Sequence, residues 1–270
     1  MDDTAPQAFY LPVSEGVFDS TLATESPWGD GQQHGGPPSA LLARAVQRCA
    51  PGHRDGGTAM AVTRISIDFL GALPQGRVEV TAEVLRPGRR IELVEATMRS
   101  GGRAVAVARA WRTRVAEDAA VTVPVEPVPP PPLPGPQEQR YLRGVAPTWG
   151  YGRAVDWRFV KGSYDEPGPA TVWARPLVPL VAGEATTGLQ RTMIVADSAN
   201  GVSAELVVSE WLFVPPTLTV TTYREATGEW ILMDAVTAIA ATGAGMAHAA
   251  LADELGGFGV ATQPLFVERR

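Results

Sequence analysis

The sequence lacks the features that mark several classes of protein. It has one cysteine, Cys49, in 270 residues, so no disulfide can form within the chain. It has no run of Lys or Arg long enough to follow a phosphate backbone and its net charge is −6, which argues against binding to nucleic acid. Its first residues, MDDTAPQ, lack the basic and apolar segments of a signal peptide. We therefore expect a cytoplasmic protein that does not bind nucleic acid.

Long apolar runs and metal motifs are also missing. The longest stretch without a formal charge, residues 235–252, is mostly Ala, Gly and Thr. It predicts soluble strand and turn, so we expect no integral membrane segment. His53 and His248 have no metal-ligand spacing to Cys, Asp or Glu, so we expect no metal site. The absence of G-x-S-x-G argues against a Ser-His-Asp hydrolase.

Proline, by contrast, is concentrated in one place. Residues 124–136 contain eight prolines and cannot form a helix or an interior strand. They predict a linker over residues 121–140, which separates an N-terminal unit (1–120) from a C-terminal unit (141–270).

The two units follow one plan, a helix and then an antiparallel meander. The helices are expected from about Pro38 and over 188–200. The expected strands are 60–70, 77–84, 91–99 and 103–114 in the first unit and 218–224, 230–240, 245–252 and 259–269 in the second. Gly101 precedes Trp111 by the same ten residues that separate Gly256 from Phe266. This repetition predicts a duplicated domain.

The second helix carries the clearest candidate for chemistry. Thr187 and Gln190 have the spacing of a capping box, and Gly201 suits a left-handed C-terminal stop, so one helix is expected from 187 to 201. Asp197 falls within its apolar arc. Such a carboxylate is either desolvated at a cost or faces a polar cavity that uses it. The alternative is a solvated Asp tilted outward near the helix end.

A central helix wrapped by a curved antiparallel sheet is the hotdog arrangement, and two copies make an α+β double hotdog. Several segments resemble the thioesterase-like superfamily related to type II acyl-CoA thioesterases. They are HGGPPSALLARAV (34–46), ADSANG (196–201), PTLTV (216–220), GEWILMDA (228–235) and the final GVATQPLFVERR. The resemblance covers nearly the whole chain.

The resemblance implies hydrolysis of a fatty acyl-CoA to free acid and coenzyme A, with no cofactor beyond the coenzyme A of the substrate. In that family an Asp, a Ser or Thr, and a Gln of the second hotdog hold a water. The Asp corresponds to Asp197 and the Gln to Gln263. The hydroxyl is Thr219 or Thr217, which share one face of a strand, with Thr219 preferred. Without a gap, the family position falls on Pro215.

The residues themselves are consistent with this chemistry. A thioester needs a polarised water, a general base and donors for the developing oxyanion. Asp197 would be the base, and the amide of Gln263 would orient the water. On sequence alone, Gln263 could instead be an edge-strand amide bonded to solvent.

Two further segments are candidates for substrate binding. His34, Gly35 and Gly36 precede a helix N-terminus, whose free N–H groups can hold a carbonyl oxygen or an anion. The alternative is a tight turn that needs glycine, with His34 in a surface or capping role. The turn 86–90, RPGRR, could meet coenzyme A phosphates through Arg86, Arg89 and Arg90, although a solvated turn is favoured.

Only the second unit is expected to be catalytic. The first helix has no acidic residue, because none occurs between Asp30 and Asp55, and Ala108 takes the place of Gln263 in the matching hairpin. We expect a homodimer or higher homo-oligomer, because exposed sheet faces and edges tend to associate.

Two other functions remain open from the sequence. One is a non-catalytic acyl-thioester or lipid-binding hotdog protein. The other is an enoyl-CoA hydratase, although that chemistry usually pairs an Asp with a nearby His and none follows Asp197 before His248.

Overall fold

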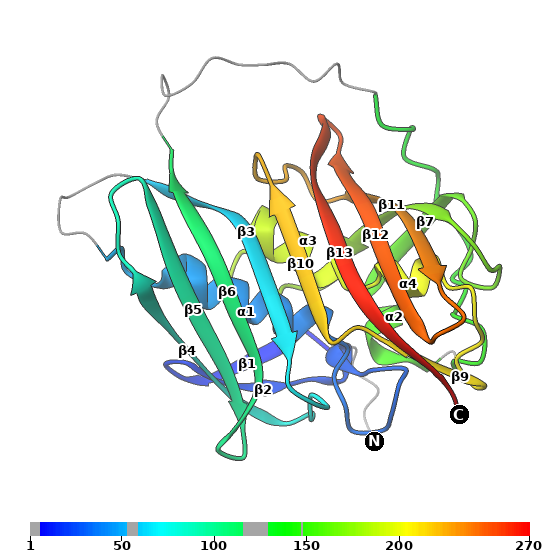
Figure 1. Cartoon of the computed structure of the whole chain (residues 1–270), viewed down its shortest axis with the longest axis horizontal. Helices are drawn as coiled ribbons and strands as arrows, with labels where there is room; N and C mark the ends of the chain where they lie inside the picture. The colour runs from blue at the N-terminus through cyan, green and yellow to red at the C-terminus, as the bar shows by residue number, and fades with distance from the viewer. Residues whose placement is uncertain (1–5, 53–58, 116–128, 147) are drawn as a thin grey trace.

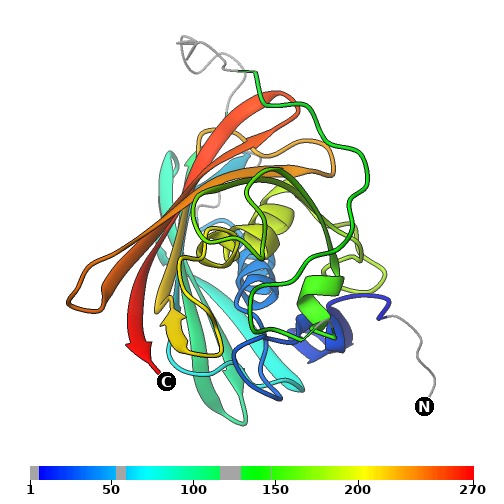
Figure 2. The same cartoon turned by 90° about the vertical axis from the view of Figure 1, so that its right-hand side faces the viewer.

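The computed structural model describes residues 6–52, 59–115, 129–146 and 148–270. Within them, one antiparallel sheet of 13 strands curves around two central helices (Figures 1 and 2). The first half contributes β1 (Tyr10–Ser14), β2 (Val17–Ser20), β3 (Met60–Phe69), β4 (Arg77–Arg86), β5 (Ile91–Ser100) and β6 (Arg103–Arg114). The second contributes β7 (Val155–Lys161), β8 (Ala170–Pro176), β9 (Trp211–Val214), β10 (Thr217–Thr222), β11 (Ile231–Ile239), β12 (Ala244–Asp253) and β13 (Gly256–Arg269).

The strand order shows the duplication directly. The sheet runs β1-β2-β4-β5-β6-β3-β10-β13-β12-β11-β8-β7, with β9 added beside β13. The halves join where β3 pairs with β10, which places Ile67 opposite Leu218 (Figure 1). Outward from this junction, β6, β5 and β4 on one side match β13, β12 and β11 on the other. The double hotdog predicted from the sequence is confirmed.

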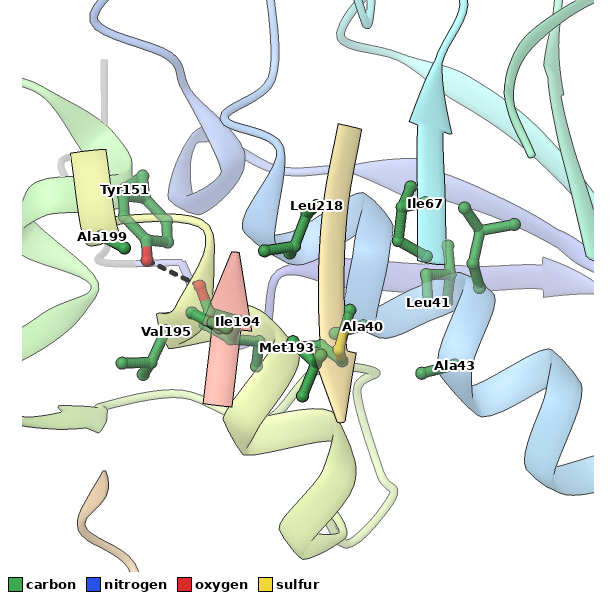
Figure 3. Close-up of a cluster of buried hydrophobic side chains, with 14 of the residues drawn as sticks. Ala40, Leu41, Ala43, Ile67, Tyr151, Met193, Ile194, Val195, Ala199 and Leu218 are labelled. Carbon is green, nitrogen blue, oxygen red and sulfur yellow. Dashed lines mark hydrogen bonds between the residues drawn. The ribbon is translucent and has the colours of Figure 1, made fainter. Parts of the chain in front are cut away.

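The central helices are α1 (Gly36–Arg48) and α3 (Gly188–Ala196), and they pack against each other. The short helices η1 (Leu22–Thr24), α2 (Gly150–Arg153) and α4 (Ala199–Val202) lie outside them in the sequence. Leu41 from α1 and Met193 from α3 are fully buried, as are Ile67 and Leu218 from the two joined strands (Figure 3). One continuous core therefore serves both halves.

The expected single helix over 187–201 is in fact two. The capping box of Thr187 and Gln190 is confirmed, but α3 ends at Ala196 with Asp197 as its C-cap, and Gly201 lies inside α4 without a positive φ. The cause is a tertiary hydrogen bond. The hydroxyl of Tyr151 donates to the carbonyl of Ile194 at 2.7 Å (Figure 3), and the N–H of Ser198 turns to Val195 instead. The break leaves Asp197 at a helix end.

Part of the proline-rich segment lies against the second half. Residues 129–140 form no helix or strand. The indole of Trp173 in β8 donates to the carbonyl of Pro131 at 3.1 Å. The side-chain amide of Gln137 bonds to both the N–H and the C=O of Phe159 in β7, each at 2.8 Å, and so covers part of that edge strand. Residues 121–128 of the expected linker lie outside the described residues, and the unit boundaries stay a prediction.

Candidate active site

The site forms where the start of α1 crosses the end of α3. A Cβ placed on Gly36 would come within 2.2 Å of the carbonyl oxygen of Ile194, and one on Gly35 within 2.7 Å of Asp197 Oδ2. Both residues must therefore be glycine for the backbones to approach this closely. Gly35 has a φ of −66°, so close approach, and not a left-handed turn, is the reason for glycine there.

Asp197 is buried at this crossing, with 4 % of its surface exposed. Burial raises the pKa of its carboxyl to about 7, against the opposing effect of hydrogen bonds from Gln263 and from the backbone at Gly35 and Gly36. The alternative of an outward, solvated Asp is wrong. A carboxylate with a pKa near neutrality can take up a proton while a large fraction of it remains ionised.

Gln263 holds this carboxylate in place. It lies on the inner face of β13, fully buried between β10 and β12, so it is not an edge-strand amide. Its Nε2 donates to the carbonyl oxygen of Asp197 at 3.0 Å and to Oδ1 at 3.1 Å, while its Oε1 accepts from the N–H of Asn200 at 3.2 Å. Both amide protons are thus used by the protein. Only the second lone pair of Oε1 remains for a water.

His34 comes from the other half of the chain and faces Asp197. Its Nδ1 lies 3.3 Å from Asp197 Oδ2 and accepts a hydrogen bond from the N–H of Gly36 at 3.1 Å. The imidazole stacks on the ring of Tyr151, with centroids 3.8 Å apart and planes 3° from parallel. The expected surface position of His34 is wrong, because the residue is 6 % exposed; the capping role is present in the bond to Gly36.

The two threonines lie on the other face of the sheet. Thr219 pairs with Thr262 across β13, and residues opposite each other share a face, so Thr219 points away from the inward Gln263. Its hydroxyl bonds to Ser66, and the hydroxyl of Thr217 donates to the carbonyl of Ile67 at 2.6 Å. The structure does not bring either hydroxyl to Asp197, contrary to our expectation. Residues two apart on a strand share a face, so the sequence shows that Thr217 and Thr219 point the same way. It does not show whether that face is turned toward the core or away from it.

A pocket of about 480 Å³ opens beside Asp197 between the two halves. It is lined by Ser26, Trp28, Gln32, Gln33, Gly35, Phe69, Gly71, Ala72, Leu73, Asp197, Leu212, Val214, Pro215, Pro216 and Phe266. Pro215, the ungapped family position for the hydroxyl, is in this lining and supplies none. The walls are largely apolar and include no Lys or Arg, which suits an uncharged acyl chain.

Sequence reasoning missed two residues of the site. Tyr151 lies just after the linker and reaches Ile194 and Ser198 from α2, with no spacing signal to reveal it. Asn200 belongs to the quoted ADSANG segment, and its backbone and side chain bond to Gln263 and to the carbonyl of Phe213. Both fix the shape of the broken helix.

The remaining candidates lie elsewhere. Arg86, the exposed last residue of β4, lies over the Trp111 ring at 5.9 Å, and Arg89 and Arg90 are exposed in the turn that follows. In the part of the chain that the structure describes, no cluster of His, Cys, Asp and Glu could hold a metal, and no helix is long and apolar enough to cross a membrane. His53 lies outside the described residues.

Comparison with known proteins agrees with this architecture. The acyl-CoA thioesterase II of Mycobacterium marinum shares 16% identity, a TM-score of 0.64 and coverage of 97% of this chain and 95% of its own. The TesB protein of Mycobacterium avium subspecies paratuberculosis shares 16%, with a TM-score of 0.65 and coverages of 96% and 95%. A hot dog protein of unknown function from Alicyclobacillus acidocaldarius shares 17%, with a TM-score of 0.69 and coverages of 99% and 99%. At these identities they show the fold alone.

Among curated proteins, none matches the chain. Family models do match it in both halves. Residues 24–113 match the acyl-CoA thioesterase N-terminal domain, and residues 124–267 match the acyl-CoA thioesterase C-terminal domain. Together they span most of the sequence, including Gly35, Asp197 and Gln263. The chain belongs to the acyl-CoA thioesterase family of thioester hydrolases.

Proposed function

We propose that this protein hydrolyses fatty acyl-CoA thioesters with Asp197 as the general base. The observation that supports this most is the buried Asp197 carboxylate, which is held by Gln263 at the wall of an apolar pocket. The water would lose a proton to Asp197 as its oxygen attacks the thioester carbonyl carbon. The C–S bond would then break, and the proton would pass to the leaving thiolate of coenzyme A.

Gln263 and the start of α1 would support this step. Gln263 fixes the carboxylate and has one free lone pair for the water. Gly35 lines the pocket at the N-terminus of a 13-residue helix, whose dipole would favour developing negative charge on the thioester oxygen. Thr217 and Thr219 have no part in this proposal. It needs no cofactor besides the coenzyme A of the substrate.

The proposal extends to the location and assembly of the enzyme. We place it in the cytoplasm and in fatty acid metabolism, and we expect a homo-oligomer. Met246 and Val260 are about half exposed on the outer face of β12 and β13, whereas the outer face of β5 and β6 carries the ion pair of Arg109 and Glu95. The face of the second half is therefore the better candidate for self-association. Sedimentation showing only a 28.6 kDa species at micromolar concentration would reject it.

Two observations bear on the other functions. A non-catalytic binding protein would gain support from a solvated Asp197 or a distant Gln263, and neither is found. An enoyl-CoA hydratase gains one supporting observation, because His34 from the first half supplies the histidine that the sequence near Asp197 lacks.

Incubation with acyl-CoA esters of graded chain length, followed by measurement of free thiol, tests the proposal. We expect thiol release with a preference for one range of chain length, because the pocket has a limited volume of about 480 Å³. In parallel, a 2-enoyl-CoA should lose its thioester and not its double bond. Loss of the double bond without thiol release would establish the hydratase, and no reaction with either ester would favour the binding protein.

A further inference from the structure

The contact between His34 and Asp197 is unusual because the imidazole nitrogen nearest to the carboxylate is a hydrogen-bond acceptor and not a donor. Nδ1 of His34 accepts the N–H of Gly36, so in the neutral ring the proton resides on Nε2. Burial lowers the pKa of His34 to about 3, so the imidazole stays neutral over the range in which the enzyme would work. The ring nitrogen that faces Asp197, Nδ1, therefore carries a lone pair and no proton.

A lone pair 3.3 Å from a carboxylate oxygen affects the two charge states of Asp197 in opposite ways. It repels the ionised form. The protonated form can donate its O–H from Oδ2 to this same lone pair, which it would share with the N–H of Gly36 in a three-centre bond. A partner that bonds only the neutral form of an acid increases that form's share.

We propose that His34 is a positioning residue that strengthens Asp197 as a general base by presenting a hydrogen-bond acceptor to it. When the water gives up its proton, Nδ1 is within reach of the new O–H, which would share its lone pair with the N–H of Gly36. The proton stays on Asp197 Oδ2 until the thiolate leaves, so the imidazole itself never becomes charged. This role rests on the proposed function, although the contact itself can be tested without substrate.

The orientation of the imidazole is fixed from three sides. The backbone N–H of His34 donates to the carbonyl of Thr24 at 2.7 Å. The ring Nδ1 accepts from the N–H of Gly36, and the face of the ring stacks on Tyr151. Tyr151 is itself anchored on Ile194 and Ser198, next to Asp197 in the chain. A ring held in this way cannot turn its Nε2–H toward the carboxylate.

No charged side chain competes with this effect among the residues that the structure describes around Asp197. Tyr151, from α2, is neutral because burial raises its pKa far above the usual value. Gln263, from β13, and the N–H groups at the start of α1 are neutral donors that favour the ionised form. His34 is thus the neighbour that favours the protonated form, alongside burial itself.

Two substitutions of His34 test its hydrogen-bond acceptor and its aromatic ring separately. His34→Phe keeps a flat ring against Tyr151 and removes the acceptor. His34→Asn removes the ring but keeps an oxygen acceptor, which can take the N–H of Gly36 in the i to i+2 geometry of an Asx turn. If His34→Phe does not give the wild-type circular dichroism spectrum, His34→Leu replaces it as the variant without an acceptor.

The measurement is the titration of Asp197 in the folded protein without substrate. Infrared difference spectra report the carbonyl band of its protonated form, which Asp197→Asn assigns by removing it. We expect His34→Phe to move the midpoint down by about one pH unit, and His34→Asn to leave it near the wild-type value. The acidic limb of kcat/KM should move with the midpoint in each variant.

Other outcomes overturn the proposal. An unmoved midpoint in His34→Phe, or a shift of equal size in both variants, would reduce His34 to a packing residue. A structural role alone predicts the reverse ranking, in which the loss of the ring does more harm than the loss of the acceptor. If wild type titrates as expected but releases no thiol, the proposed function fails and the contact between the two residues stands.

Discussion

Two pockets occupy equivalent places in the two halves, and only one surrounds a buried carboxylate. The Asp197 pocket lies between the start of α1, the approach to β10, the end of β13 and the segment 69–73. A second pocket, of about 290 Å³, lies between the start of α3, the start of β3, the end of β6 and the segment 222–226. Across the junction of β3 and β10, α1 corresponds to α3, β10 to β3, and β13 to β6. The segment 69–73 after β3 corresponds to the segment 222–226 at the end of β10. Duplication thus supplied two cavities of the same construction.

The second pocket also has a carboxylate at a helix N-terminus. Glu225 Oε1 accepts from the N–H of Leu189 at the start of α3, at 3.2 Å, but Glu225 is exposed. Asp197 is buried against the start of α1 and held by Gln263. At the position of Gln263 the first half has Ala108, which β3 places opposite Ile67. The two carboxylates at helix N-termini thus differ in burial and in a fixed amide partner, and the proposed role of Asp197 as a base depends on these two features.

The largest effect should come from removing each carboxylate in turn. Asp197→Asn preserves shape and should lower turnover by about 10²-fold or more, because the proposed general base is lost. Glu225→Gln, its counterpart in the second pocket, keeps the oxygen that accepts from Leu189 and should leave turnover unchanged. Thiol release by the two purified variants decides the comparison. Retention of most activity in folded Asp197→Asn would remove the single-site assignment.

The same two variants should differ in stability. The folded protein keeps the proton of Asp197 up to about pH 7, whereas the unfolded chain loses it near the ordinary value of 3.8. The cost of burying this carboxylate thus appears as the pH rises from 4 to 7. Asp197→Asn cannot ionise, so its free energy of unfolding relative to wild type should rise over this range by about 4 kcal/mol.

Denaturant unfolding of Asp197→Asn, Glu225→Gln and wild type at pH 4, 5.5 and 8 measures this. Glu225→Gln is the matched control, because the Glu225 side chain is exposed in the folded protein. Curves for Asp197→Asn and wild type that run parallel across the three pH values would mean that Asp197 titrates normally.

Substitutions at the equivalent positions Gln263 and Ala108 should give a smaller difference in turnover. Gln263→Ala removes the donor to Asp197 Oδ1 and loosens the carboxylate, so turnover should fall by about tenfold. Ala108→Ser alters the equivalent strand position in the half without a base, so turnover should stay as in wild type. Rates are compared per folded molecule, as judged by circular dichroism. Equal losses in both variants would indicate that this strand position matters for packing and not for chemistry.

Local sequence patterns predicted the parts of the site that depend on neighbours in the chain. The capping box at Thr187 marked the start of α3, helical periodicity placed Asp197 inward, and matched hairpin spacing paired Gln263 with Ala108. Each of these depends on residues a few positions apart. The duplication made the fold predictable for the same reason, since each half repeats short local units.

The other parts depend on contacts between distant segments. The break after Ala196 is caused by Tyr151 from α2, and the place of His34 by the crossing of α1 and α3. The spacing of apolar residues along one helix or strand does not reveal which helices cross, or which side chain from a distant segment bonds to them. The face on which Thr219 lies follows from its register with β13 and β3, which a single strand does not define.

The smallest effect should come from Thr219 itself. Its hydroxyl bonds to Ser66 on the face of the sheet opposite Gln263, so Thr219→Val should keep turnover within about twofold of wild type. Val suits a strand as well as Thr does, and both are branched at Cβ, so the strand should be undisturbed. Ser66→Ala, which removes the other hydroxyl of the pair, is the matched control and should behave alike. A fall of tenfold or more in Thr219→Val, with Ser66→Ala unaffected, would return the hydroxyl to the mechanism and require β10 to turn this face toward Asp197 when substrate binds.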